Sequence, residues 1–185
     1  MIIILILVGK TASGKDSIIN ELVAKHGYKK IITYTSRPMR KGEKQDITYH
    51  FVSEDDFKQK IENNFFAEWK TYNTEFDVWY YGTAIEDLEN AEDNSVIILT
   101  PDGVRDVLPK LSNKPKVFYI YANNLTIKKR LISRGDDKTE AERRLLHDNE
   151  DFKGVENKVD KIVFNNEGTR IKDVVNKILE LMEDN

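Results

Sequence analysis

The strongest constraint on the fold lies at the start of the chain, where an apolar run leads straight into a glycine-rich segment. Residues 2–8 are all isoleucine, leucine or valine, which is typical of a strand buried on both faces of a parallel sheet. Two glycines separated by four residues follow, and a lysine comes directly after the second glycine. This spacing predicts a loop whose backbone N–H groups converge on phosphate oxygens and whose lysine reaches the terminal phosphates. The predicted phosphate-binding residues are Gly9, Lys10, Thr11, Ala12, Ser13, Gly14, Lys15, Asp16 and Ser17.

A helix is expected directly after this loop. Apolar residues recur at helical spacing from Ser17 until Gly27, which has the position of a C-cap. The positive end of the helix dipole would face the bound phosphate. Asp16 stands where most loops of this kind have a serine or threonine that contacts magnesium. It fits an acidic residue of the first helical turn, a metal ligand, or a charge that weakens phosphate binding, and Ser17 is the nearest hydroxyl.

Composition limits the class of protein and of partner. The chain has 185 residues, enough for one α/β domain with a substantial core. It carries 29 basic and 32 acidic residues for a net charge of −3, so no nucleic-acid or anionic-membrane surface is indicated. There are no cysteines, which excludes disulfides and fits a reducing compartment. The N-terminal run is too short to span a membrane and lacks signal-peptide features, so we expect a cytoplasmic protein without nucleic-acid or membrane partners.

Strand and helix patterns alternate along most of the chain. This alternation predicts an α/β fold with a doubly wound core, in which helices flank a parallel sheet. The core of this single domain is expected to comprise residues 1–32, 84–124 and 150–185. Residues 33–83 have the pattern of a strand-rich insert, and residues 125–149 that of a charged helical insert.

Local signals set several boundaries within these segments. Apolar residues over 29–34 predict one strand. The run Thr83-Ala84-Ile85-Glu86 matches a capping box and predicts a helix that it opens. A further helix is expected from about Gly103, after a buried strand at 95–99.

The strand-rich insert begins with Arg37 and Arg40, three apart on a loop fixed by Pro38. Guanidinium forks bind phosphate in a bidentate manner, so the pair fits a monophosphate clamp, although a solvated basic loop has the same composition. The segments that follow are Tyr49-His50-Phe51, Phe66-Ala67-Glu68-Trp69 and Tyr80-Tyr81-Gly82-Thr83. Together with the phosphate loop, these segments resemble guanylate kinase, and the resemblance extends over the whole chain.

The resemblance implies a P-loop kinase core that transfers the γ-phosphoryl group of ATP to GMP or dGMP, with Mg²⁺ on the donor phosphates. Residues 33–83 would be the nucleoside monophosphate-binding insert. Glu68 would accept hydrogen bonds from the guanine N1–H and exocyclic amine, and adenine would leave this buried carboxylate unpaired. The hydroxyls of Thr33 and Thr83 would also contact the base. The acceptor phosphate would be held by Arg37, Arg40, Tyr49 and Tyr81.

Residues 125–149 resemble the family's arginine-rich lid over the triphosphate. Phosphoryl transfer requires positioning, charge neutralisation and exclusion of water, and a mobile cationic lid supplies all three. Arg130 equally fits a structural partner of helix carboxylates. Asn165, just after the last predicted strand, falls where the family approaches the adenine. The residues implied in catalysis are Lys15, Arg130, Arg134, Arg143 and Arg144.

Two further features depart from the family pattern. The family usually has Asp-x-Asp after the strand that ends at Leu99, but here Thr100 stands at the second aspartate position and Asp102 follows two residues later. The link at 71–79 is longer than usual, which leaves open another or a modified nucleoside monophosphate as acceptor. A non-catalytic guanylate-kinase-like binding module is a second alternative, although such modules tend to lose the lysine and lid arginines kept here. A GTPase switch, which would read guanine through an Asn-Lys-x-Asp segment, is the least favoured.

Overall fold

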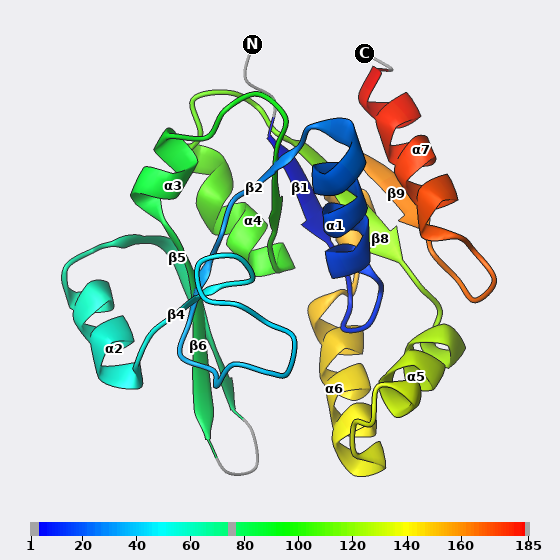
Figure 1. The fold of residues 1–185 in the computed structure, drawn as a ribbon, viewed down its shortest axis with the longest axis horizontal. Coiled ribbons are helices and arrows are strands. Elements are labelled where there is room, and N and C mark those ends of the chain that lie inside the picture. Colours follow the sequence, from blue (N-terminus) through cyan, green and yellow to red (C-terminus); the bar gives the residue numbers. More distant parts are fainter. Residues whose placement is uncertain (1–3, 74–76, 184–185) are drawn as a thin grey trace.

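The computed structural model describes residues 4–73 and 77–183, so Ile2 and Ile3 of the predicted first strand lie outside the described residues. The core is a parallel sheet of five strands in the order β2-β7-β1-β8-β9 (Figure 1). The central strand β1 (Leu5–Val8) is completely buried, which explains why its sequence is apolar without alternation. The predicted fold class, a parallel sheet flanked by helices, is confirmed. The other core strands are β2 (Lys29–Lys30), β7 (Ser95–Ile98), β8 (Lys116–Tyr121) and β9 (Lys161–Phe164).

Different helices cover the two faces of this sheet, because successive residues of β1 point to opposite sides. On one face, Leu5 packs in a cluster with residues of α1 (Lys15–His26) and α7 (Ile171–Glu183). On the other face, Ile6 packs in a cluster that includes residues of α4 (Pro101–Val107). The loop after β1 follows the carboxyl end of this strand. It therefore lies at the carboxyl edge of the parallel sheet, where open α/β folds bind their ligands.

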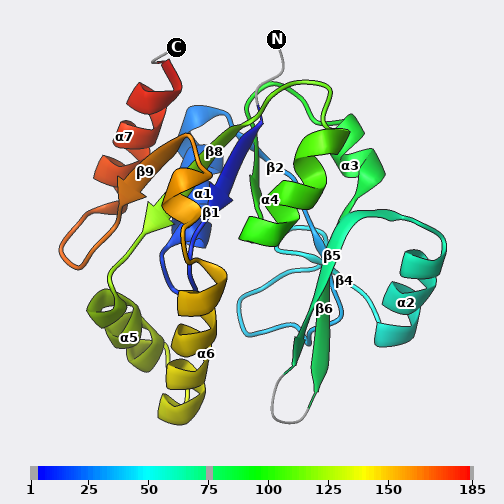
Figure 2. The same ribbon diagram turned by 180° about the vertical axis from the view of Figure 1, so that it is seen from behind.

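The strand-rich insert forms a second sheet, of four strands in the order β4-β3-β6-β5 (Figure 2). β3 pairs in parallel with β4 and antiparallel with β6, and β5 and β6 form a long antiparallel hairpin. Phe57 stacks on Phe66 with ring centroids 4.4 Å apart and so holds α2 on this sheet. The bounds are β3 (Tyr34–Thr35), β4 (His50–Phe51), α2 (Glu54–Glu62), β5 (Phe66–Asn73), β6 (Val78–Ala84) and α3 (Ile85–Glu89).

Two helices, α5 (Asn124–Ser133) and α6 (Lys138–Asp151), form the helical insert. The side chains of Asn123 and Asp137 cap them by accepting a backbone N–H three residues later. A small cluster around Leu131 packs between the helices. Figures 1 and 2 show this helix pair and the four-stranded sheet on opposite sides of the loop that follows β1. Two short 3-10 helices are also present, η1 (Leu108–Lys110) and η2 (Val155–Asn157).

The prediction of one continuous strand at 29–34 is wrong, because the structure has two separate strands there, β2 and β3. The chain leaves the core sheet after Lys30 and pairs again only from Tyr34, now in the insert sheet. The apolar pattern does not register this change of partner, because residues on both sides of the crossover contribute to buried surfaces. The segment between the two strands is thus the connection from core to insert.

The predicted capping box at Thr83 is also wrong. Ala84 is the N-cap of α3 and provides no side-chain hydrogen bond, while Thr83 remains in β6. The Thr83 hydroxyl donates to Glu68 Oε1 at 2.6 Å, so a contact across the hairpin takes the group that the local motif would have used. Helix α4 begins earlier than predicted, because the Thr100 side chain accepts the N–H of Gly103 and caps the helix ahead of it.

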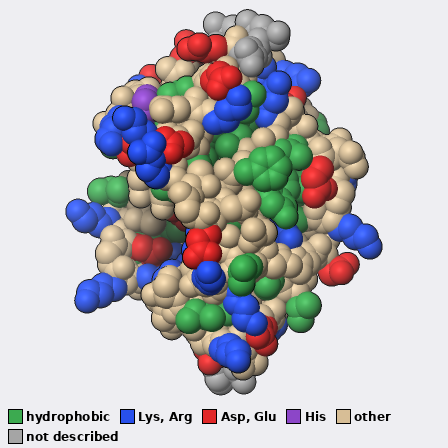
Figure 3. Space-filling model, turned by 90° about the vertical axis from the view of Figure 1, so that its right-hand side faces the viewer, with side chains coloured by type: hydrophobic (Ala, Val, Ile, Leu, Met, Phe, Trp, Pro, Cys, Tyr) green, Lys and Arg blue, Asp and Glu red, His purple; other side chains and the backbone are tan. Residues whose placement is uncertain are grey.

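The surface carries charges of both signs. On the face shown in Figure 3, lysine and arginine side chains alternate with aspartate and glutamate around a group of hydrophobic side chains. A mixed surface of this kind does not concentrate positive potential as a nucleic-acid-binding face does. In the parts of the chain that the structure describes, no helix has the length and apolar character needed to cross a membrane.

Candidate functional site

In the loop between β1 and α1, backbone carbonyl groups surround the side-chain ammonium of Lys15. Lys15 Nζ donates to the backbone carbonyl of Gly9 at 2.6 Å and to that of Lys10 at 2.9 Å. Gly14 has a φ of 100°, and a Cβ at this position would lie 2.3 Å from Asn165 Nδ2. Only glycine fits such a backbone and such a close approach. The spacing of glycines in the sequence therefore reflects a steric requirement of the loop.

This loop is an electropositive site. It opens α1, so the N-terminal end of the helix dipole points into it. Burial lowers the pKa of Lys15, and the nearby carboxylates of Asp16 and Asp148 act in the opposite direction. Asp16 and Ser17 lie in the first turn of α1 with their side chains exposed. Both of these side chains offer oxygen atoms beside the lysine.

A pocket of about 460 Å³ extends from this loop between α1, α5 and the end of β9. Its polar lining and its position at the helix terminus suit the phosphates and sugar of a nucleotide. Among the predicted donor-site residues it is lined by Ala12, Gly14, Lys15, Asp16, Ser17 and Asn165. The helical insert contributes Arg130 and Arg134 to the same pocket.

Asn165 and Arg130, which are distant from the loop in the sequence, hold it in place through hydrogen bonds. Asn165 is completely buried, and its Nδ2 donates to the Ser13 carbonyl at 2.8 Å. Arg130 donates to the Ala12 carbonyl at 3.1 Å and to the Asn165 carbonyl at 3.0 Å. The partners of Arg130 are thus carbonyl oxygens of the donor site rather than helix carboxylates. These contacts fix the loop that the nucleotide would occupy.

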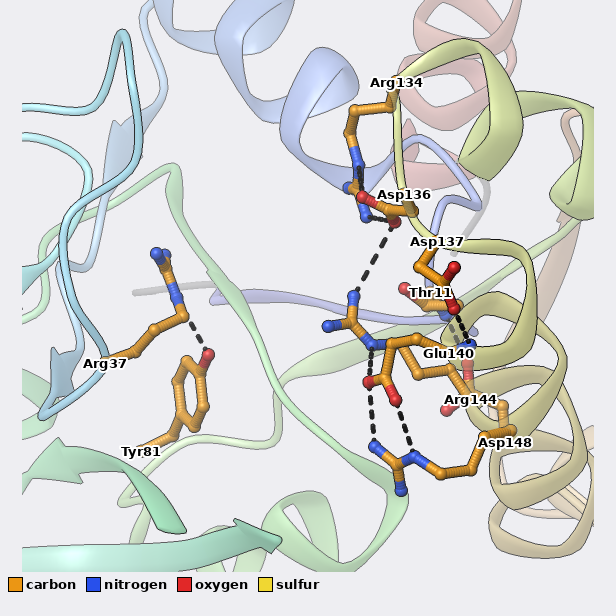
Figure 4. A network of polar contacts seen from close by, with 10 residues as sticks. Thr11, Arg37, Tyr81, Arg134, Asp136, Asp137, Glu140, Arg144 and Asp148 are labelled. Carbon is orange, nitrogen blue, oxygen red and sulfur yellow. Dashed lines mark hydrogen bonds and ion pairs between the residues drawn. The ribbon is translucent and has the colours of Figure 1, made fainter. Parts of the chain in front are cut away.

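The lid arginines are paired with lid carboxylates. Arg134 donates to Asp136, and Arg144 donates to Glu140 at 2.8 Å with Asp136 a further 3.7 Å partner (Figure 4). Arg143 also binds Glu140, through two contacts of 2.8 and 2.9 Å. These hydrogen bonds, acting against burial, lower the pKa of Glu140 to about 2. Of the four arginines on the helical insert, Arg130 and Arg134 thus line the pocket beside the loop, and Arg143 and Arg144 are paired with Glu140.

On the opposite side of the site, Arg37 is held in a fixed orientation. It is 4% exposed, its Nε donates to the Tyr81 hydroxyl at 3.0 Å, and its two Nη atoms bind Glu43 at 2.8 and 3.0 Å. Figure 4 shows Arg37 and Tyr81 across from the lid residues. Glu43 also accepts the backbone N–H of Arg40 at 2.7 Å. Although burial acts to raise it, these hydrogen bonds lower the pKa of Glu43, so the carboxylate stays charged.

Two tyrosines, Tyr49 and Tyr81, lie beside Arg37 in the predicted phosphate clamp. The Tyr49 and Tyr81 rings meet edge to face with centroids 5.9 Å apart, and the Arg37 guanidinium lies 5.5 Å from the Tyr49 centroid. Burial raises the pKa of Tyr49, which keeps its hydroxyl protonated as a donor. Burial and the charges of Arg37, Arg134 and Arg144 lower the pKa of Arg40. The insert and lid arginines thus act on one another across the site.

The half-buried Glu68 and the buried Thr83 form a polar pair on the β5–β6 hairpin. A β-bulge between Phe66 and Glu68 shifts the hairpin register, so Glu68 lies opposite Thr83. Glu68 Oε1 accepts the Thr83 hydroxyl at 2.6 Å, and Oε2 would lie 3.2 Å from a Cβ built on Gly103. Burial raises the pKa of Glu68 despite the Thr83 hydrogen bond. The carboxylate is therefore poorly solvated and suited to accept further N–H donors.

Thr33 and Thr100 occupy less direct positions. Thr33 is half-buried between β2 and β3, and its carbonyl accepts the backbone N–H of His50 at 2.9 Å. Thr100 serves as the N-cap of α4, as described above. Asp102 pairs with Lys70 at 2.7 Å and with Arg105 at 3.0 Å. Thr100 therefore supplies no carboxylate where the family usually has aspartate, and the carboxylate of Asp102 is already paired with Lys70 and Arg105.

The long link predicted at 71–79 is the end of the β5–β6 hairpin, and residues 74–76 within it lie outside the described residues. Tyr72 pairs with Trp79 in the hairpin register, and its ring lies 5.3 Å from that of Tyr81. Burial raises the pKa of Tyr72. The link thus adds an aromatic side chain next to the acceptor clamp.

Sequence reasoning missed three residues of the site. Glu43 orients Arg37, Asp148 accepts the Thr11 backbone N–H at 2.5 Å, and Asn149 accepts from Lys10 Nζ at 2.6 Å. The only local signal for Glu43 is an acidic residue six positions after Arg37 on a turn-rich loop, and this signal is weak because charged loops often contain such residues. The contacts of Asp148 and Asn149 join segments more than 130 residues apart, and no local pattern reveals them.

One string in the chain, Asn157-Lys158-Val159-Asp160, matches the Asn-Lys-x-Asp pattern of GTPases. Asp160 accepts the backbone N–H of Val117 at 2.7 Å and so joins the start of β9 to that of β8. The phosphate loop follows the carboxyl end of β1 in the same parallel sheet, so this string lies at the opposite edge. It has a structural role here and reads no base beside the loop.

Comparison with known proteins agrees with this geometry. A family model described as "Guanylate kinase" matches residues 2–185. A guanylate kinase of Helicobacter hepaticus is 32% identical over 179 residues, which cover 93% of this chain and 86% of that protein. A guanylate kinase of Sulfurimonas denitrificans is 36% identical over 149 residues, covering 77% and 70%.

The fold has a counterpart among solved structures as well. The crystal structure of guanylate kinase from Anaplasma phagocytophilum superimposes with a TM-score of 0.71 over 99% of this chain and 85% of that one, at 19% sequence identity. At this level of identity the likeness establishes the fold alone.

Proposed function

This chain belongs to the guanylate kinase family, and from its site we propose that it transfers the γ-phosphoryl group of ATP to GMP. The observation that carries the choice of acceptor is the half-buried Glu68 carboxylate paired with the buried Thr83 hydroxyl. A desolvated carboxylate gains most from partners that bring N–H donors, and guanine brings two on one edge. Adenine has no donor at the corresponding ring nitrogen, so it would leave the carboxylate without a partner.

The acceptor phosphate is proposed to bind the clamp of Arg37, Arg40, Tyr49 and Tyr81. Arg37 is already held by Tyr81 and Glu43, so little rotamer freedom is lost when the phosphate binds. Arg40 approaches the phosphate from the same loop. Thr33 lies between the core and this insert, where its hydroxyl would approach the base.

The donor is proposed to bind the pocket beside the phosphate loop, with Asn165 at its nucleoside end and Arg130 beside the loop with the other lid arginines. Lys15 would contact the terminal phosphates from its position on the Gly9 and Lys10 carbonyls. The lid residues Arg134 and Arg144 would exchange Asp136 and Glu140 for phosphate oxygens as the lid closes, with Arg143 beside them. Catalysis then consists of holding the two phosphates in line, neutralising charge and excluding water.

Transfer from ATP generally uses Mg²⁺, and the residues around the loop fit this ion. Among residues 4–73 and 77–183, no group of three or more metal-binding side chains is present. Mg²⁺ commonly takes one or two protein oxygens together with phosphate oxygens and water. Asp16 and Ser17 offer such oxygens in the first turn of α1, and we propose that they hold the ion. When bound, Mg²⁺ supplies charge neutralisation at the donor phosphates.

Chromatographic analysis of products tests this function. The protein would be incubated with Mg·ATP and each ribo- and deoxyribonucleoside monophosphate in turn. We expect ADP together with GDP or dGDP, and the ratio of the two rates defines the sugar preference. Conversion of another monophosphate would move the error to Glu68 and the 71–79 link. GMP binding without turnover would favour the non-catalytic module and direct attention to Asp16 and Thr100.

The same proposal includes predictions about the moving parts of the protein and about its location and partners. We propose that 33–83 and 125–149 move as separate inserts on the core formed by 1–32, 84–124 and 150–185. Amide hydrogen exchange with and without the two nucleotides would test these boundaries, because closure protects the inserts. A cytoplasmic location without nucleic-acid or membrane partners stays a prediction, and cell fractionation would test it.

A further inference from the structure

Asp148, near the end of α6, contacts the phosphate loop directly. Its Oδ2 accepts the backbone N–H of Thr11 at 2.5 Å (Figure 4). The next residue, Asn149, accepts a hydrogen bond from Lys10 Nζ at 2.6 Å. Two successive residues of a lid helix are therefore bonded to two successive residues of the loop. This joins the base of the lid to the loop that would hold the donor.

The peptide unit that Asp148 binds is also the one that holds the catalytic lysine. The Thr11 N–H and the Lys10 carbonyl belong to the same peptide group, and that carbonyl accepts Lys15 Nζ at 2.9 Å. A trans peptide directs its N–H and C=O to opposite sides, so a carboxylate and an ammonium fix the two ends of one plane. Such a chain of hydrogen bonds strengthens each member through polarisation.

The same helix carries a lid arginine. Arg144 lies one helical turn before Asp148, so the two side chains leave the same face of α6. A bond between Asp148 and the loop therefore anchors the end of α6 to the loop, one helical turn from Arg144. Burial raises the pKa of Asp148, and the Thr11 N–H and the Lys15 charge oppose this rise. The carboxylate is thus partly desolvated and compensated by the loop itself.

We propose that Asp148 is a positioning residue for phosphoryl transfer, which fixes Lys15 through the Lys10–Thr11 peptide and Arg144 through α6. The inference rests on the proposed function, since it concerns the two cations assigned to the transferred phosphoryl group. It predicts a defect in turnover rather than in binding of ATP. A carboxylate that merely repelled phosphate would have the reverse effect, because its removal would tighten ATP binding.

The test compares Asp148→Ala with the conservative Asp148→Asn and with Asp151→Asn. The asparagine retains an oxygen that accepts the Thr11 N–H. Asp151 is a carboxylate on the same helix, but it pairs with His147 at 3.2 Å and with Lys70 at 3.9 Å, away from the loop. Steady-state kcat and KM would be measured with Mg·ATP and GMP at a temperature well below the Tm of every variant.

We expect Asp148→Ala to lower kcat by about 10- to 100-fold, as loss of positioning does, with the Kd for ATP changed by less than about threefold. Asp148→Asn should recover most of kcat, and Asp151→Asn should match the wild-type protein. Unchanged kcat in Asp148→Ala, or equal losses in the alanine and asparagine variants, would overturn the proposal. Tighter ATP binding with unchanged kcat would overturn it in favour of simple repulsion.

A measurement on the nucleotide-free protein separates this inference from the proposed function. The Thr11 amide resonance should lie downfield and exchange slowly with solvent in the wild-type protein, because the N–H is bonded to a carboxylate. In Asp148→Ala it should move upfield and exchange faster. An unchanged Thr11 amide would overturn the inference even if GMP is phosphorylated. A wild-type protein that phosphorylates no monophosphate would instead overturn the proposed function.

Discussion

Removal of the Glu68 carboxylate is the most direct test of how this protein would select its acceptor. The side chain is half-buried, bonded to Thr83 at 2.6 Å, and close to the backbone of Gly103. A hydrogen bond to a charged group contributes about 1.5–3 kcal/mol, and guanine would donate two to this carboxylate. Part of the binding energy lost in Glu68→Ala is offset, because the variant no longer has to desolvate a charged group when the base binds. We therefore expect a net loss of about 2–4 kcal/mol in acceptor recognition, or roughly 30- to 700-fold in kcat/KM for GMP.

The assay measures kcat/KM for GMP and for AMP at saturating Mg·ATP, through coupled detection of ADP. AMP makes no use of the carboxylate, so Glu68→Ala should lower the GMP value and leave the AMP value within a few fold. Thr83→Val serves as the graded control, since it removes only the hydroxyl that orients Glu68 and should cost about tenfold. A ratio of GMP to AMP that stays at its wild-type value in Glu68→Ala would refute the assignment of the guanine pocket.

Three other predictions follow from the same geometry. Lys15→Ala should lower kcat by about 100-fold or more with an unchanged circular dichroism spectrum, and turnover within about tenfold of wild type would remove the loop lysine from the mechanism. Arg37→Lys should raise KM for GMP by about tenfold, with a smaller change in kcat, because an ammonium lacks the two-pronged donor; steady-state titration with GMP checks this, and an unchanged KM would contradict it. Burial raises the folded-state pKa of Glu68, so the stability that this carboxyl contributes is present below its unfolded pKa and is lost as pH rises through the folded value. Urea unfolding should therefore show Glu68→Gln gaining stability over the wild-type protein as pH rises above about 4, the unfolded pKa of glutamate, and a difference independent of pH would exclude this origin.

The sequence predicts those parts of the site that depend on local patterns. The apolar run before Gly9 and the glycine spacing follow from burial and backbone sterics, which are local properties, and the structure has both where they were expected. Six of the residues predicted to bind the donor line one pocket, and their role in binding stays a prediction. Local rules fail at Thr83, where a capping motif competes with a partner on the neighbouring strand. Because the hydrogen bond to Glu68 depends on hairpin register, no window of sequence around Thr83 reveals it.

The contacts that orient the catalytic groups are the hardest to predict. Glu43 lies near Arg37 in the sequence, but an acidic residue on a charged loop is common and carries little information by itself. The Asp148 contact depends on the placement of α6 against the loop, and α6 packs with α5 and Ala12 in the small cluster around Leu131. Long-range polar contacts of this kind have no periodic signature, since each involves one residue from each segment.

The brace formed by Asn165 on the phosphate loop has a consequence for how the protein is made. The loop sequence is complete by Ser17, yet β1 finds its neighbours only in β7 and β8, and the amide that holds the Ser13 carbonyl follows β9. On the ribosome, the nascent chain therefore carries the phosphate-binding motif long before it can form a nucleotide site. The proposed donor site would therefore be complete only after Asn165 has emerged and docked on the loop, so a product truncated before β9 should bind nucleotide poorly.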